Sequence, residues 1–274
     1  MIEIVIIFLF AIIFSAFGTV VGFGGGIFMI PFLLVFFQVP LNVVAGSVIL
    51  ALFPSSLIST IFNARANKID FLAGIALEVP TIFGTIFGSL LISFLPVYIL
   101  EIAFSIFISL IGFYTYRKGY KGNLKPGKNH IFFKLNKIGP RVIKKTETGA
   151  YRISFFVAVC FGVMAGMMAG MFGVGGGFLK TPIMINVFNI PPTVAAATSL
   201  FMIVFTSLTG SFSHYLLGNI NFTYAVPIVV GFIIGSFAGN HLNLKLSENF
   251  LTKLIGIGLV FAGFCVIVNT IVLR

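Results

Sequence analysis

Charged residues are scarce in this chain, which has six acidic side chains among 274 residues. Tryptophan is absent, and the two cysteines, Cys160 and Cys265, lack the spacing of a metal or redox motif. We interpret them as small packing residues. No Ser/His/Asp set, metal cluster or phosphate-binding loop is recognisable, which argues against an enzyme, a metal site, a bound cofactor or an ATP-driven pump.

Hydrophobic residues make up 59% of the chain, and the mean hydropathy is +1.15. A soluble protein of this length needs more polar surface than that. Whole segments are apolar on every face, which excludes the alternating pattern of a membrane barrel. We therefore predict an all-α integral membrane protein in the cell membrane.

Eight apolar segments are long enough to cross a hydrocarbon core of about 30 Å. They cover residues 2–20, 43–62, 71–94, 97–116, 153–170, 193–213, 222–243 and 249–272. Two shorter segments, 27–37 and 178–188, follow glycine-rich motifs and are expected to be broken or re-entrant helices. Eight spans place both termini on the same side as the loop between the halves, whereas ten spans place them outside.

Basic residues are concentrated in one loop. Residues 117–152 hold 11 of the 17 Lys and Arg and one of the six acids, so the rest of the chain has a net charge of +1. This distribution excludes a nucleic-acid surface and favours a cytoplasmic connector under the positive-inside rule. The short loop Asn63–Asp70 carries Arg65 and Lys68, and we expect it on the same side as the connector.

The chain repeats itself at an offset of 151 residues. The motif GFGGGIFMIP, starting at Gly22, aligns with GVGGGFLKTP, starting at Gly173, and seven of the 19 positions from 22 to 40 are identical. We predict two homologous halves of about four spanning helices each. The expected parts are a first membrane repeat (1–116), the basic connector (117–152) and a second membrane repeat (153–274).

The two glycine triplets allow two interpretations. Small residues let membrane helices pack closely, which suits Gly84/Gly88 and Gly235/Gly239 best. Consecutive glycines instead favour a helix break at membrane depth, where the unpaired N–H groups of the next helix attract an anion. Paired interrupted segments in two halves are also typical of a transporter's binding site. The expected anion ligands are the backbone groups of Gly24, Gly25, Gly26, Gly175, Gly176 and Gly177.

Hydroxyl side chains follow each glycine motif. Ser47 aligns with Thr198, and Ser199 comes directly after it. Substrate contact is one interpretation, because hydroxyls donate hydrogen bonds to oxyanions. The alternative is that each hydroxyl bonds a carbonyl of its own helix one turn back.

Ionisable residues inside the apolar segments are functional suspects. Lys180 stands three residues after the second triplet, where the first half has Met29. It can attract an anion in the site or extend to the membrane interface. Glu78 can carry a proton in a coupled transport step.

Polar residues at the ends of two segments are candidates for a transport pathway. Asn63 aligns with His214, a residue type that titrates near physiological pH. A solvated position at the interface is the alternative for His214. Arg65 lies nearby in the sequence NARANKIDF, where its charge favours a role in topology.

These motifs resemble those of the TauE/SafE family of sulfite exporters and related permeases. Two G-x-G-G-G-x4-P elements, each with a proline nine residues on and a cluster AGS or AATS, carry the resemblance. The loop NARANKIDF is similar to that family's basic turn ending in G-x-[VI]-D, and GNIN at 218–221 is its echo. Asn67 and Asn221 depart from the turn glycine and the acid of that pattern.

The resemblance implies transport of small sulfur-containing anions, such as sulfite, a sulfonate or thiosulfate, with export from the cytoplasm. We expect alternating access by rocking of one half on the other. The expected partners are a small anionic substrate and the lipid bilayer but no nucleic acid, and a homodimer stays open. Uptake or export of a different small solute, or a non-transporting scaffold that uses the basic connector, are the alternatives.

Overall fold

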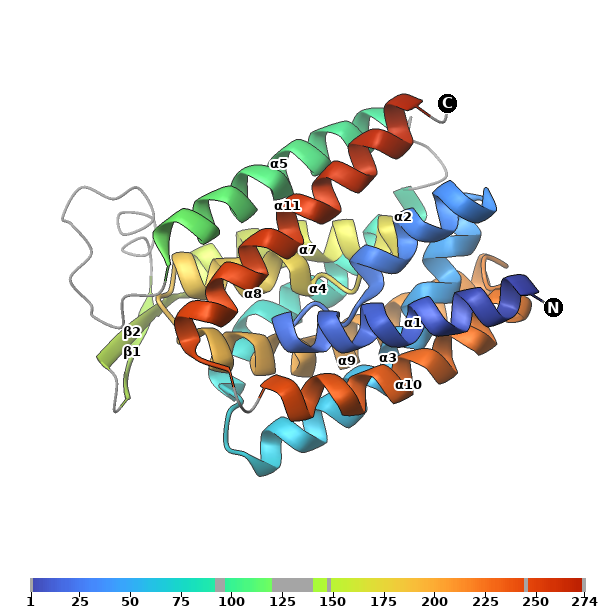
Figure 1. Cartoon of the computed structure of the whole chain (residues 1–274). Coiled ribbons are helices and arrows are strands. Elements are labelled where there is room, and N and C mark those ends of the chain that lie inside the picture. The colour runs from blue at the N-terminus through green and yellow to red at the C-terminus, as the bar shows by residue number, and fades with distance from the viewer. Residues whose placement is uncertain (1, 92–96, 120–139, 147–148, 244–245, 273–274) are drawn as a thin grey trace.

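A computed structural model describes residues 2–91, 97–119, 140–146, 149–243 and 246–272. These residues form ten helices and one antiparallel hairpin (Figure 1). The elements are α1 (Ile2–Val21), α2 (Gly26–Phe37), α3 (Leu41–Arg65), α4 (Phe71–Leu91), α5 (Val97–Lys118), β1 (Arg141–Thr146), β2 (Gly149–Ser154), α7 (Phe155–Phe172), α8 (Gly177–Asn186), α9 (Pro192–Leu216), α10 (Phe222–Asn243) and α11 (Glu248–Val272).

Seven of the described helices are long and apolar enough to cross a membrane: α1, α3, α4, α7, α9, α10 and α11. The predicted span 97–116 forms α5, which is not among these seven. Large apolar side chains lie exposed along the helices, as expected where the solvent is lipid. Examples are Phe83, Phe87, Val159, Phe212, Val226 and Phe264. The chain is a multi-pass membrane protein.

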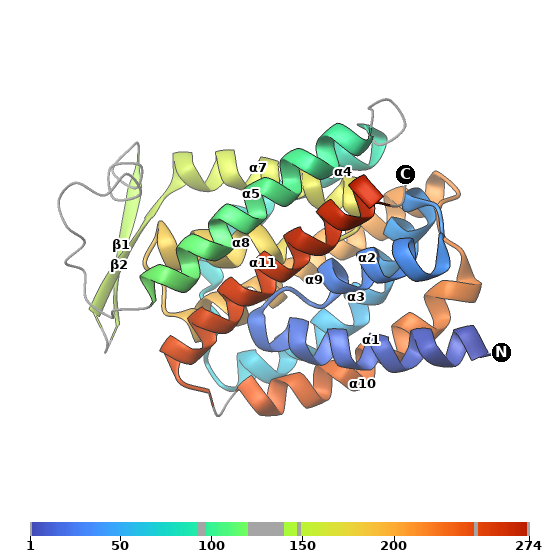
Figure 2. The same cartoon turned by 45° about the horizontal axis from the view of Figure 1, so that its top comes forward.

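At each glycine motif, the chain reverses direction between a longer helix and a short one. The two helices form a pair that starts and ends at the same end of the molecule. Figures 1 and 2 show α1 entering from the end of the molecule that holds both termini and α2 returning toward that end. The α7–α8 pair does the same from the opposite end, where β1 and β2 lie. The short helices predicted after the triplets therefore form re-entrant pairs.

Of the two placements considered for the termini, the one on the connector's side, which followed from eight spans, is wrong. Both termini lie at the end of the molecule opposite the connector hairpin (Figures 1 and 2). The reason is that a re-entrant pair adds apolar length without a net crossing, so only α3, α4 and α5 separate the first pair from the connector. The loop that follows α3 lies at the connector end, as expected.

Glycines allow two pairs of helices to pack backbone to backbone. Helix α4 runs beside α7, and α1 runs beside α10. A methyl group at Gly84 would lie 2.4 Å from the carbonyl oxygen of Val163, and one at Gly235 2.3 Å from that of Ile12. The packing role predicted for these glycines is thus confirmed.

The basic connector contains regular structure that the sequence did not lead us to expect. Strands β1 and β2 pair in antiparallel register, with Val142 opposite Ile153. Tyr151 and Ile153 are buried, and the N–H of Arg152 donates to the carbonyl of Phe188 beyond α8. The hairpin is therefore seated on the end of the helical bundle.

Close packing at Gly88 predicts a stability effect. A methyl group there would lie 2.1 Å from the carbonyl oxygen of Met167, so Gly88→Ala forces α4 and α7 apart. We expect a loss of about 1–3 kcal/mol, seen as a lower thermal midpoint in detergent by circular dichroism. The control is Gly258→Ala, whose methyl group would meet only ring atoms at 3.2 Å or more. Equal midpoints for the two variants would contradict this account.

Candidate functional site

The glycine triplets form two loops with matching backbone conformation. Gly25 and Gly176, the residues before α2 and α8, have φ values of 100° and 71°. Positive φ also occurs at Gly22 and Gly24, and at their counterparts 151 residues later. This region costs an ordinary residue about 1–2 kcal/mol. Glycine is required here because each loop must reverse the chain inside the protein.

Each loop presents backbone donors at the start of a helix. Within the described residues, the N–H groups of Gly25, Gly26 and Gly175–Gly177 form no hydrogen bond. Gly24 differs from its predicted role, because its N–H donates to the carbonyl of Gly18 at 3.0 Å. The free N–H groups and the positive end of the helix dipole suit an anion.

The two loops meet inside the molecule. A methyl group at Gly177 would lie 2.7 Å from the carbonyl oxygen of Gly22, and one at Gly26 3.4 Å from that of Gly173. The Thr181 hydroxyl also donates to the Gly22 carbonyl, at 3.3 Å. Helices α2 and α8 therefore begin close together and run toward opposite ends of the molecule (Figure 1).

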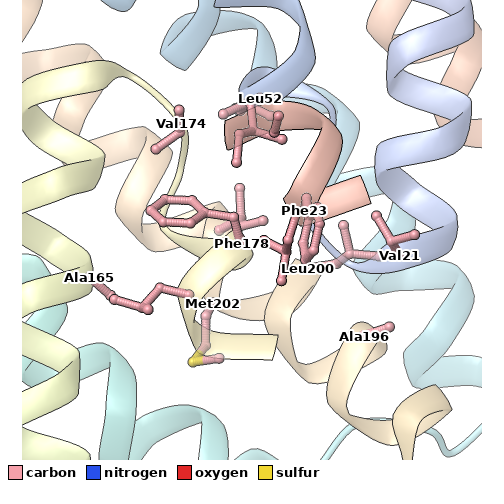
Figure 3. Close-up of a cluster of buried hydrophobic side chains, with 14 of the residues drawn as sticks. Val21, Phe23, Leu52, Ala165, Val174, Phe178, Ala196, Leu200 and Met202 are labelled. Carbon is pink, nitrogen blue, oxygen red and sulfur yellow. The ribbon is translucent and has the colours of Figure 1, made fainter. Parts of the chain in front are cut away.

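Two apolar side chains fill the space between the loops. A methyl group at Gly24, Gly26 or Gly175 would lie 2.7–3.0 Å from Leu52 of α3. A methyl group at Gly24, Gly175 or Gly177 would lie 2.6–3.5 Å from Ile203 of α9. Leu52 and Ile203 are equivalent positions in the repeat. Figure 3 shows Leu52 among further buried apolar side chains, including Phe23, Val174 and Phe178. The structure is thus closed at the point where the loops meet.

A buried ion pair lies beside the second loop. The Lys180 ammonium is 2.5 Å from Oε2 of Glu78 and donates to the Thr206 hydroxyl at 2.9 Å. That hydroxyl donates to Oε1 of Glu78 at 2.6 Å. Lys180 and Thr206 are fully buried, and Glu78 is nearly so. Lys180 and Glu78, predicted separately as an anion ligand and a proton carrier, are therefore partners.

The hydroxyl candidates divide into two groups. Ser199 lies against the second loop, with its Oγ 2.8 Å from the position of a methyl group at Gly177. Thr198 instead accepts a hydrogen bond from the N–H of Asp70 at 2.9 Å. Ser47 exchanges long hydrogen bonds of 3.4 Å with the backbone of Asn221. Ser199 is thus near the loops, while Thr198 and Ser47 fix the starts of α4 and α10.

The pathway candidates lie away from the loops. Asn63 is buried and donates to the carbonyl of Ser59 at 2.8 Å and to Asn240 at 3.2 Å. His214 is buried rather than solvated, with Nε2 2.9 Å from the Gly170 carbonyl oxygen. Arg65 is exposed in the last turn of α3. The structure therefore does not bring these three residues to the place where the loops meet.

Three residues near the loops were not among the predicted ones. Leu52 and Ile203 look like ordinary core residues, and Thr206 like an ordinary helix hydroxyl. The signal available for the first two is that they align at the offset of 151 residues. For Thr206, the register gives only Ser55 as its counterpart, so the sequence contained no sign of the ion pair.

Comparison with known proteins gives one family. The family model described as Sulfite exporter TauE/SafE matches residues 7–266. "Probable membrane transporter protein YunE" of Bacillus subtilis is 28% identical over 273 residues, which cover 94% of this chain and 95% of that protein. "Probable membrane transporter protein MJ0441" of Methanocaldococcus jannaschii is 27% identical, covering 85% and 84%.

A plant relative matches a shorter stretch. "Sulfite exporter TauE/SafE family protein 3" of Arabidopsis thaliana is 32% identical over 111 residues, or 39% of this chain and 23% of the plant protein. No solved structure matches the chain.

The buried pair predicts non-additive stability effects. Lys180→Met leaves the Glu78 carboxylate buried without its counter-charge, and we expect a loss of about 3–5 kcal/mol. The double variant Glu78→Val/Lys180→Met takes the residues found at the equivalent positions 229 and 29. Because it removes both charges, it should be more stable than the single variant. Thermal unfolding in detergent measures both, and a double variant that is the less stable of the two would contradict the prediction.

Proposed function

Because the chain belongs to the sulfite exporter TauE/SafE family, we propose that this membrane transporter carries small sulfur-containing anions out of the cytoplasm. Sulfite, a sulfonate and thiosulfate are the proposed substrates. The two nearly full-length relatives are named as probable membrane transporters, and the plant relative as a member of a sulfite exporter family. The chain belongs to a transporter family and is not an enzyme.

The observation that carries the proposal is the meeting of two helix N-termini at one buried place. Free N–H groups of Gly26 and Gly177 and the positive ends of two helix dipoles lie there together. Discontinuous helices whose N-termini face an anionic group are a recurring device in transporters. We assign Gly25, Gly26 and Gly175–Gly177 as donors to the oxyanion, with Ser199 as an added hydroxyl donor.

We further propose that the two halves are inverted repeats that alternate in access. Helix α3 (41–65) and α9 (192–216) have the same bounds at the offset of 151 residues. The positive-φ glycines also match at this offset. The α1–α2 pair starts and ends at the end of the molecule that holds the termini, and the α7–α8 pair at the end that holds the connector hairpin (Figure 1). Rocking of the halves would move Leu52 and Ile203 from between the loops and expose the donors to one side at a time.

The membrane potential favours the proposed direction. With the cytoplasm negative, each exported negative charge gains about 2.3 kcal/mol per 100 mV. Export therefore needs no coupling ion. We place the connector hairpin on the cytoplasmic side of the cell membrane, because residues 117–152 hold most of the positive charge.

The donor role of the second loop is tested with Gly176→Val. Gly176 has a φ of 71°, and a methyl group there would lie 3.2 Å from the Ala165 carbonyl oxygen and from the Lys180 side chain. We expect sulfite counter-flow in proteoliposomes to fall by at least about tenfold, a loss of 1.4 kcal/mol of transition-state stabilisation. Gly258→Ala is the control and should transport normally.

A folded Gly176→Val variant with undiminished sulfite flux would refute the glycine-loop site. Folding is checked by gel filtration and circular dichroism of the same preparation. Counter-flow with chloride, taurine and divalent cations in place of sulfite tests the alternative that another solute is carried.

Transport of net negative charge predicts a response to voltage. An imposed potential, negative on the side that holds sulfite, should speed its efflux from proteoliposomes, because the anion moves down the electrical gradient. Reversing the potential should slow it. A flux that does not change with potential would show electroneutral exchange and overturn export without a coupling ion.

A further inference from the structure

The Lys180–Glu78 pair lies against the proposed anion donors. Lys180 is in the first turn and a half of α8, and its Cε is 3.2 Å from the position of a methyl group at Gly176. The side chain thus lies alongside the loop whose N–H groups are free. Glu78 from α4 and Thr206 from α9 close around its ammonium. A buried Lys–Glu pair therefore stands beside the donors.

The first half has no such charges at the equivalent positions. Met29 replaces Lys180, Val229 replaces Glu78, and Ser55 replaces Thr206. Met29 lies in α2, the helix that follows the first loop, and is fully buried. This position therefore packs well without a charge. Burial of two ions is costly, and apolar residues of similar volume usually give equal or better stability. Packing alone therefore does not account for the pair.

We propose that the Lys180–Glu78 pair sets the charge selectivity of the anion site, so that the site prefers a monovalent anion over a divalent one. This inference rests on the proposed function. Lys180 attracts the anion, and Glu78 stays ionised beside it and offsets that charge. The pair is neutral as a unit, and the backbone donors supply only partial positive charge. One negative charge suits such a site, while a second meets the carboxylate of Glu78.

Electrostatics gives the size of the effect. At an effective dielectric constant of about 20, a unit charge about 6 Å away changes the binding of another unit charge by about 100-fold. A divalent anion experiences this effect twice and a monovalent anion once. Removing the Glu78 charge should therefore raise the preference for a divalent anion by about 10–100-fold.

The other titratable groups near α4 have partners elsewhere or are exposed. The further titratable groups on α7 and α9, which pack against α4, are His214, whose ring is held by Gly170, and the exposed Tyr215 and Cys160. Asp70, at the start of α4, is bound by the hydroxyl of Tyr151 from the connector hairpin. Within the part of the chain that the structure describes, Lys180 and Glu78 are thus the charged groups that face the second loop.

The test removes the charges of Glu78 and Lys180 one at a time and then together. Wild type, Glu78→Gln, Lys180→Met and Glu78→Val/Lys180→Met are reconstituted in proteoliposomes. The uptake of thiosulfate, which is divalent, is divided by that of methanesulfonate, which is monovalent. Because each ratio is compared with wild type, differences in size between the two anions cancel. Glu248→Gln is the control, since Glu248 binds Thr193 at the start of α9 instead.

We expect the ratio to follow the charge of the pair. Glu78→Gln should raise it about 10–100-fold, Lys180→Met should lower it, and the double variant should return toward wild type. Glu248→Gln should leave it unchanged. Where a variant transports too slowly, the rise in thermal midpoint that each anion produces gives the same ratio from binding alone.

Each contrary result has a distinct meaning. A ratio that stays at the wild-type value in Glu78→Gln and Lys180→Met, while both still bind anions, overturns the inference and leaves the proposed function intact. Loss of binding of both anions in all three variants shows a purely structural pair and also overturns it. Wild-type protein that carries neither these anions nor sulfite overturns the proposed function together with the inference.

Discussion

The constraint on which the structure depends is that backbone polar groups inside a bilayer need partners or cover. Two glycine loops interrupt the helices at depth and leave N–H groups unpaired. They are tolerated because the protein encloses them: Leu52 and Ile203 fill the space between them, and the Gly22 and Gly173 carbonyls lie close by. Close glycine contacts, such as that of α4 with α7, bring neighbouring helices together around them.

Much of the fold could be predicted from the sequence, because lipid imposes length and composition on each helix. The short helices after the glycine triplets were found for the same reason. The side on which the termini lie could not be predicted, since hydropathy does not distinguish a crossing from a return. The hairpin at 141–154 was missed because its Lys- and Arg-rich sequence is also typical of a simple loop.

The site was less predictable than the fold. The repeat register identified the loops, yet the pairing of Lys180 with Glu78 joins residues 102 positions apart and has no counterpart in the other half. No local pattern reports a contact of that kind. Thr198 was a candidate for its hydroxyl, and that oxygen accepts a hydrogen bond from the N–H of Asp70, a contact that only tertiary packing reveals.

The difference between the halves has a consequence for the transport cycle. In an inverted repeat, the two access states arise when the halves exchange conformations, so identical halves would give states of equal free energy. Here the Lys180–Glu78 pair joins α8 to α4, whereas the equivalent positions on α2 and α10 are the apolar residues Met29 and Val229. Opening a water path to α8 therefore hydrates two charges, and opening one to α2 hydrates none. The pair is buried in the closed structure, so the state that opens toward α8 should gain more from hydration than the state that opens toward α2.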